Sequence, residues 1–160
     1  MDRSLTVTWD DPMAAFAQGK QGSPLEYLRA IRDGKLPPPP IAKLLGFALT
    51  EVEPGHAVFE IDPGEQHYNP MGAVHGGIAF TLLDSAMSCA VQSRLPAGSG
   101  STTLEIKANL VRPVTLISGR LRAVGKIVHL GSRTATAEGR LEDAAGKLYA
   151  HASTTCLILG

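Results

Sequence analysis

The sequence has no excess of either charge and few aromatic residues. Its 15 Lys and Arg residues balance its 15 Asp and Glu residues, so the formal net charge at pH 7 is zero. A chain without a basic excess lacks the electrostatic footprint of a protein that binds nucleic acid. Aromatic residues make up 5% of the chain, too few for surfaces that stack single-stranded nucleic acid. We therefore expect no nucleic-acid partner, and any anionic ligand must be held by local groups.

Cysteine and long apolar runs are also scarce. The two cysteines, Cys89 and Cys156, lie in apolar stretches, which favours buried free thiols over a disulfide or a metal site. The chain contains neither a Cys-x-x-Cys nor a His-Glu-x-x-His pattern, so no zinc or other metal is expected. No apolar run follows the N-terminal Met-Asp-Arg-Ser-Leu-Thr. We therefore expect neither a signal peptide nor a membrane partner, and a cytoplasmic location.

The length of 160 residues fits one domain with one core, preceded by an extension. Gly22-Ser23-Pro24 predicts the start of a helix over residues 24–33, and apolar residues at helical spacing before it suggest another short helix. Four prolines at 37–40 predict an extended segment. We therefore divide the chain into a helical, proline-rich extension over residues 1–40 and a domain over residues 41–160.

Within the domain, the hydrophobic period indicates one long helix among strands. A hairpin is predicted over residues 47–62, and a broad apolar surface predicts a buried helix over residues 76–92. Four strand-like runs follow, at residues 101–111, 121–128, 134–141 and 148–159. This order predicts an α+β fold in which an antiparallel meander curves around the helix.

The start of the predicted helix is the candidate site. His75-Gly76-Gly77 leads into it, and a helix N-terminus attracts a negative oxygen through its dipole and free N–H groups. Glycine leaves that backbone accessible. Asp84 is the single carboxylate of an apolar helix, where it is costly unless paired or used. Without further evidence, these residues are explained equally well by a functional site or by close helix packing at the glycines and an Asp84 that is simply paired.

A wider set of residues resembles a known family. The set comprises Asn69-x-x-Gly72-x-x-His75-Gly76-Gly77, then Leu83-Asp84, then Thr103 ahead of Asn109-Leu110-Val111-Arg112-Pro113. Over residues 44–158 the chain resembles the hotdog-fold thioesterases, in particular the phenylacetate-pathway (PaaI-like) branch. The resemblance implies a curved antiparallel sheet around one long central helix. It also implies hydrolysis of acyl-CoA without a bound cofactor, by a homodimer or a homotetramer built as a dimer of dimers.

The resemblance also implies roles for the residues at the helix start. The N–H of Gly76 polarises the thioester carbonyl, and Gly77 supplies a second donor. Asn69 orients the loop or the thioester, and His75 fixes the turn. Asp84 acts as base or nucleophile, and Thr103 hydrogen-bonds the water or the carboxylate.

Helix geometry separates the residues at the helix start from Asp84. A helix rises about 1.5 Å per residue, which places Asp84 roughly 12 Å along the axis from Gly76. Two antiparallel copies related by a two-fold axis can bring one group beside the other. We therefore predict a composite site with Asn69, His75, Gly76 and Gly77 from one subunit and Asp84 and Thr103 from its partner.

The phosphates of CoA require cations or N–H donors at the mouth of the site. The candidates are Arg112 and the turn Gly131-Ser132-Arg133, although solvated charges at strand ends are the commoner explanation of such residues. The role of His67, close to the motif, stays open.

Two other functions compete with thioester hydrolysis. The hotdog fold also supports hydratases and dehydratases of enoyl or hydroxyacyl thioesters, and it can form a non-catalytic acyl-CoA-binding module. The carboxylate at position 84 favours hydrolysis over simple binding. The acyl group stays open among aryl, arylacetyl and medium-chain groups.

Overall fold

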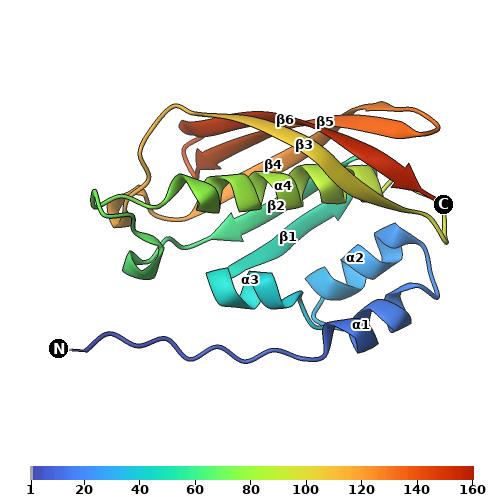
Figure 1. Ribbon diagram of the computed structural model, residues 1–160, viewed down its shortest axis with the longest axis horizontal. Coiled ribbons are helices and arrows are strands. Elements are labelled where there is room, and N and C mark those ends of the chain that lie inside the picture. The colour runs from blue at the N-terminus through green and yellow to red at the C-terminus, as the bar shows by residue number, and fades with distance from the viewer. Residues whose placement is uncertain (1) are drawn as a thin grey trace.

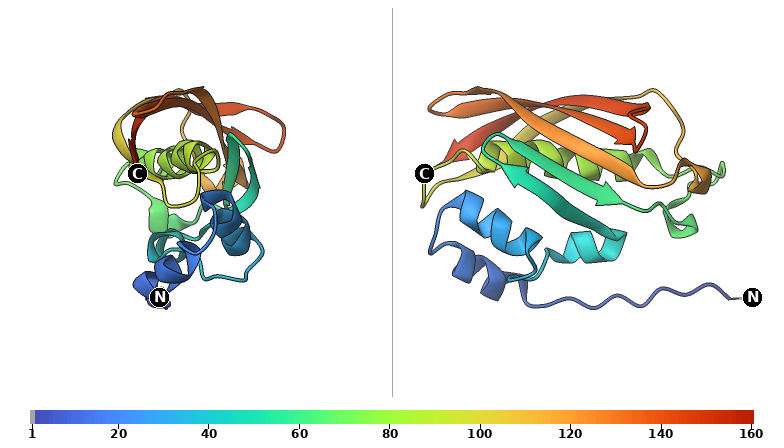
Figure 2. Two further views of the ribbon diagram at one scale, coloured as in Figure 1. Left: turned by 90° about the vertical axis from the view of Figure 1, so that its right-hand side faces the viewer. Right: turned by 180° about the vertical axis from the view of Figure 1, so that it is seen from behind.

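A computed structural model describes residues 2–160 as a curved antiparallel sheet that wraps around one long helix (Figure 1). Viewed from the end, the sheet arches over this helix, and the N-terminal helices lie beneath it (Figure 2). The strands are β1 (Phe47–Glu53), β2 (His56–Ile61), β3 (Gly100–Leu110), β4 (Leu121–Leu130), β5 (Thr134–Asp143) and β6 (Leu148–Leu159). The helices are α1 (Pro12–Gly19), α2 (Pro24–Arg32), α3 (Pro40–Leu45) and α4 (Gly76–Gln92), with short 3₁₀ turns η1 (Glu65–His67) and η2 (Leu116–Ser118). The predicted α+β class is confirmed.

The order of the strands corrects one part of the expected meander. The order across the sheet is β1-β2-β4-β5-β6-β3, and every neighbouring pair is antiparallel. The strands β4, β5 and β6 do form a meander. Strand β3 lies at the far edge instead, where Gly100 pairs with Leu159 and Leu110 with Ala150 of β6. Residues 111–120 carry the chain from this edge back to β4, and alternating hydrophobicity cannot reveal such a crossover because it reports faces and not neighbours.

The helix α4 packs closely on the concave face of the sheet. Its buried residues are Ala79, Leu82, Leu83, Ala86, Met87, Ala90 and Val91. The approach is closest at Gly125 of β4, where a Cβ atom would lie 2.2 Å from the carbonyl oxygen of Ala86. A side chain at this position would therefore force the helix backbone away from the sheet.

We expect Gly125→Ala to lower the free energy of unfolding by about 1–3 kcal/mol through overpacking. Gly139→Ala is the matched comparison. A Cβ atom there would lie 3.0 Å from Cδ2 of Leu83 and from Cγ of Met87, which are side-chain atoms that can shift more easily than a helix backbone. Urea unfolding followed by circular dichroism measures both variants. Equal losses, or a larger loss at Gly139, would contradict the proposed backbone contact.

The N-terminal extension covers the other edge of the sheet. Helix α2 begins at the predicted position, because the Ser23 hydroxyl accepts from the Glu26 N–H while the Glu26 carboxylate accepts from the Ser23 N–H. Helix α2 packs along β1. The prediction of an extended segment through residue 40 is wrong at its end, since Pro40 is the first residue of α3. Proline suits this position because its φ is preset and its missing N–H would be unpaired.

None of the helices in residues 2–160 is long and apolar enough to cross a membrane.

Candidate active site

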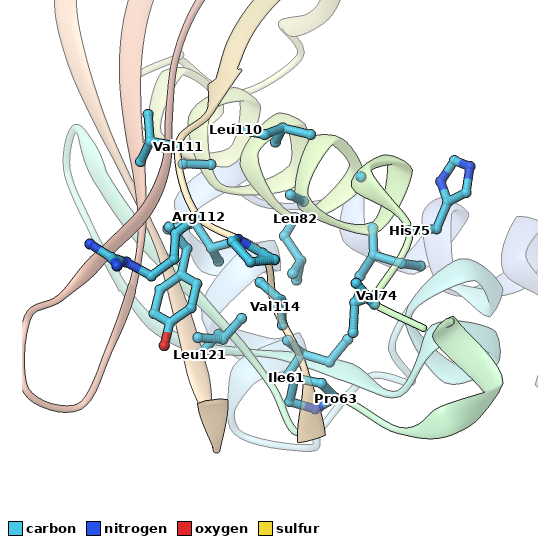
Figure 3. Close-up of a pocket in the computed structure, with 18 of the residues that line it drawn as sticks. Ile61, Pro63, Val74, His75, Leu82, Leu110, Val111, Arg112, Val114 and Leu121 are labelled. Atoms are coloured by element: carbon cyan, nitrogen blue, oxygen red, sulfur yellow. The ribbon is translucent and has the colours of Figure 1, made fainter. Parts of the chain in front are cut away.

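A cavity of about 320 Å³ lies between the start of α4 and the ends of the neighbouring strands (Figure 3). Most of its lining is apolar: Ile61, Pro63, Ala73, Val74, Ile78, Ala79, Leu82, Leu110, Val111, Pro113, Val114, Leu121, Leu141 and Ala150. Polar groups reach it from Asn69, His75, Gly76, Arg112 and Tyr149. The cavity thus joins an apolar chamber to the positive end of a helix dipole. We call it the acyl cavity, after the ligand that the resemblance implies.

His75 caps the helix that opens into this cavity. Its Nδ1 accepts from the N–H of Gly77 at 2.9 Å, and its own N–H donates to the carbonyl oxygen of His67 at 2.8 Å. Since Nδ1 is an acceptor, the proton of the neutral ring lies on Nε2. The ring points away from the apolar chamber (Figure 3). The cap occupies the N–H of Gly77, so the structure gives Gly77 a different task from the second donor that the sequence suggested.

Gly76 is the first residue of α4, and it lines the cavity. The first N–H groups of a helix have no intrahelical acceptor, which leaves that of Gly76 available to a ligand. A Cβ atom at this position would lie 2.6 Å from Cδ1 of Leu110. The end of β3 is therefore packed directly against the helix start.

Two polar residues hold the loop ahead of the helix. The Oδ1 of Asn69 accepts from the N–H groups of Met71 at 2.9 Å and Ala73 at 3.3 Å. Asn69 thus orients the loop, one of the two roles suggested for it, and its amide group can still donate toward the cavity that it lines. His67 is buried, and its Nδ1 accepts from the N–H of Gly64 at 3.0 Å. The sequence left its role open because only the fold shows these backbone partners.

Asp84 and Thr103 form a separate pair that does not line the cavity. The Thr103 hydroxyl donates to Oδ1 of Asp84 at 2.8 Å, and this contact joins α4 to β3. Both residues are half-buried. Nearby, the hydroxyl of Ser101 is buried and has no hydrogen-bond partner in the described part of the chain. The side of the molecule formed by α4 and β3 therefore carries a carboxylate fixed by a hydrogen bond and a buried hydroxyl group without a partner.

Two unpaired thiols lie near this carboxylate. Burial raises the pKa of Cys89 to about 12, and the Asp84 carboxylate adds to the effect. Burial also raises the pKa of Cys156, which lies opposite Thr103 in the β3–β6 ladder. Both thiols stay protonated near neutral pH, which makes them poor nucleophiles.

The candidate cations for CoA lie at opposite ends of one subunit. Arg112 is anchored at the cavity, where its Nε donates to the Leu148 carbonyl oxygen at 3.2 Å and its guanidinium lies 6.0 Å from the Tyr149 ring centre. Gly131, Ser132 and Arg133 follow the far end of β4. A strand of ten residues spans about 33 Å. One subunit therefore does not bring these two candidates together.

The chain is similar to known thioesterases in its sequence and in its fold. The model of the thioesterase superfamily matches residues 71–150. The 1,4-dihydroxy-2-naphthoyl-CoA hydrolase of Listeria monocytogenes is 27% identical over 108 residues, which cover 68% of this chain and 86% of that enzyme. The structure of the Escherichia coli PaaI protein, from the phenylacetic acid degradation operon, has a TM-score of 0.68 at 25% identity and covers 75% of this chain and 84% of its own. A mutant thioesterase of Pseudomonas aeruginosa has a TM-score of 0.70 at 27% identity, with coverages of 84% and 93%.

Proposed function

The chain belongs to the thioesterase superfamily, and we propose that it is an acyl-CoA thioesterase whose active site is shared by two subunits. The proposal rests on one observation, which is that the polar groups needed for hydrolysis lie at two separate places in the subunit. Gly76 opens into an apolar cavity, whereas the Asp84–Thr103 pair lies two turns farther along α4 and outside that cavity. Thioester hydrolysis needs a donor for the carbonyl oxygen and a base or nucleophile beside the carbonyl carbon.

The edge strand β3 supports a homodimer. In residues 2–160 it pairs with β6 alone, so eleven residues of strand have one open side. Leu104 and Leu110 are 57% and 50% exposed along it. A long open edge with exposed apolar side chains is a template for pairing with another strand. A second copy of β3 can satisfy this edge by antiparallel pairing.

The neighbouring face of α4 supports the same interface. Its hydroxyl groups turn back onto the helix: Thr81 donates to the Gly77 carbonyl oxygen at 3.0 Å and Ser85 to that of Thr81 at 2.8 Å. Side chains satisfied in this way leave a smooth surface of small residues, on which a second helix can pack closely.

Two contacts predict where the two-fold axis of the proposed dimer crosses β3. Gly76 lies against Leu110, and Asp84 is bonded to Thr103. An axis that brings Gly76 beside Asp84 of the partner subunit must therefore also bring Leu110 beside Thr103 of the partner subunit. It crosses β3 halfway between these two residues, near Ile106 and Lys107. This interface is compatible with a dimer of such dimers, since β3 and α4 use only one side of the molecule.

In the proposed reaction the Gly76 N–H and the helix dipole stabilise the negative charge that develops on the thioester oxygen. Asp84 of the partner subunit removes a proton from water, or attacks the carbonyl carbon itself, and Thr103 holds the carboxylate in place. When Asp84 acts as a base, the hydroxide from water adds to the carbonyl carbon, the carbon–sulfur bond breaks, and the CoA thiolate takes up the proton that Asp84 removed. When Asp84 acts as a nucleophile, the bond breaks to give the CoA thiolate and an acyl-aspartyl anhydride, which water then hydrolyses. This second step releases the free acid, restores the carboxylate and supplies the proton of the CoA thiol. No metal or bound cofactor is required.

The cavity suggests the class of acyl group. Its apolar lining and volume of about 320 Å³ suit an aryl, arylacetyl or medium-chain group better than a short or charged one. We expect kcat/KM for benzoyl-, phenylacetyl- and octanoyl-CoA to exceed that for acetyl- and malonyl-CoA by at least about tenfold, since each buried methylene contributes about 0.8 kcal/mol.

Thiol release from this panel and from an enoyl-CoA, followed with a thiol reagent and with chelator present, tests the function. The high thiol pKa of Cys89 keeps its background reaction low. Release of CoA supports hydrolysis. Hydration of an enoyl-CoA without thiol release would favour the hydratase alternative, and binding without either reaction would favour a carrier.

A further inference from the structure

A second cavity, of about 540 Å³, lies between the N-terminal helices and the start of β3. Its walls come from α1, α2, the last residue of α4, residues 98–100 and the C-terminal end of the chain. It lies at the opposite end of α4 from the acyl cavity, where Figure 1 shows α1 and α2 close to the C-terminus. The helices that form half of it precede residues 71–150, which match the superfamily.

The walls of this cavity combine aromatic, cationic and bare backbone groups. Phe16 and Tyr27 supply rings, and Nζ of Lys20 lies 4.8 Å from the Phe16 ring centre. Five of its twelve lining residues are glycines. Gly98 and Gly100 leave their backbone open to a ligand, since no atom lies within 4 Å of a Cβ position there, whereas the Tyr27 ring covers Gly19. A planar base stacks on aromatic rings, and phosphates take cations and backbone N–H donors. These groups together suit a nucleotide.

The two-fold axis inferred above places this cavity beside the acyl cavity of the partner subunit. If the axis crosses β3 near Ile106 and Lys107, Gly100 lies opposite Pro113 of the partner subunit. Gly100 lines the second cavity, and Pro113 lines the acyl cavity. From Thr103 to Gly100 the strand advances about 10 Å, which the pantetheine arm of CoA can span.

The same arrangement brings Arg133 of one subunit toward Arg112 of the partner subunit, the two cations that one subunit keeps apart. The carbonyl oxygen of Arg133 accepts from the N–H of Ile158 at 2.9 Å, and the next residue, Leu159, lines the second cavity. The backbone of Arg133 thus pairs with the residue next to the lining of this cavity. Arg112 of the partner subunit approaches from the acyl side, because it directly precedes Pro113.

We propose that the second cavity binds the nucleotide end of the acyl-CoA whose acyl group occupies the partner's acyl cavity. The proposal rests on the composite active site described above. It gives the N-terminal helices a task, which is to recognise the phosphoadenosine part of the substrate.

Lys20→Glu tests the cavity, with Lys35→Glu as the matched charge reversal, since Lys35 is exposed in the extension and lines none of the described cavities. We expect Lys20→Glu to raise KM for an acyl-CoA about tenfold and to leave KM for the corresponding acyl-pantetheine unchanged. Lys35→Glu should change neither value. Equal KM changes for the two substrates, or no change, would overturn the proposal. Thermal unfolding verifies that both variants are folded.

Calorimetry with 3′-phosphoadenosine 5′-diphosphate separates this proposal from the proposed function. Binding that Lys20→Glu weakens about tenfold supports the cavity even if no thioester is hydrolysed. Hydrolysis of acyl-CoA without such binding rejects the cavity and retains the thioesterase.

Mixed dimers identify the subunit that binds the nucleotide. Each site would take Asp84 and the second cavity from the same subunit. A dimer of an Asp84→Asn chain and a Lys20→Glu chain should therefore show the raised KM. A dimer of a wild-type chain and a chain with both substitutions should show the wild-type KM. The reverse pattern would overturn the assignment.

Discussion

Replacing Asp84 by Asn is expected to lower kcat for acyl-CoA hydrolysis by about 10²–10⁴-fold, because the amide can neither remove a proton from water nor attack the carbonyl carbon. Folding should change little. The side chain keeps its shape, and the amide oxygen of the variant can still accept from the Thr103 hydroxyl, as Oδ1 of Asp84 does at 2.8 Å. Steady-state kinetics at saturating substrate and thermal unfolding measure the two effects separately.

Ser85→Ala is the matched control for this variant. Ser85 is the next residue of α4, and its hydroxyl donates only to the carbonyl oxygen of Thr81. Removal of this hydroxyl should leave kcat within about twofold of wild type, since alanine keeps the small side chain that the proposed interface requires and only one hydrogen bond within the helix is lost. An Asp84→Asn enzyme with kcat within about tenfold of wild type would remove Asp84 from the mechanism.

The sequence predicted the helices and strands of the domain well, but it did not predict which strands pair with each other. The bounds of α4, residues 76–92, follow directly from the glycines at its start and the broad apolar surface after them. The pairing of β3 with β6 could not be predicted, because a period of two defines which face is buried and leaves the partner strand open. Composition alone could not predict the role of Pro40. A run of prolines indicates an extended segment, although its last residue can begin a helix, as Pro40 does.

The separation of Gly76 from Asp84 was predictable from the rise of a helix, whereas the hydrogen bonds of individual side chains around the site were not. The resemblance to the hotdog-fold thioesterases suggested polarisation for Gly76, base or nucleophile chemistry for Asp84 and hydrogen bonding for Thr103, whereas the residues alone left Asp84 open between packing and catalysis. The use of the Gly77 N–H by His75 depends on the ring orientation in the folded cap. The buried hydrogen bonds of His67 depend on a loop that closes only in the folded domain.

Gly76→Pro is expected to lower kcat by about 10²–10³-fold, because it removes the single N–H that polarises the thioester oxygen. The backbone tolerates the change. Proline is favoured at the first position of a helix, and His75, with ψ of 133°, already has the extended conformation that a following proline requires. Gly76→Ala is the control, since its Cβ atom meets Leu110 in the same way but its N–H remains. A loss as large in Gly76→Ala would mean that crowding by Leu110, and not the N–H, limits the reaction.

Mixing the two inactive variants tests whether the site is shared. In a dimer of one Asp84→Asn chain and one Gly76→Pro chain, one composite site contains both defects and the other contains neither. Random exchange of equal amounts makes half of the dimers mixed, so activity should recover to about a quarter of the wild-type value per subunit. A site built within one chain could recover nothing, because every chain would carry a defect. Subunit exchange after mild denaturation, followed by thiol release, therefore decides between one-subunit and two-subunit catalysis.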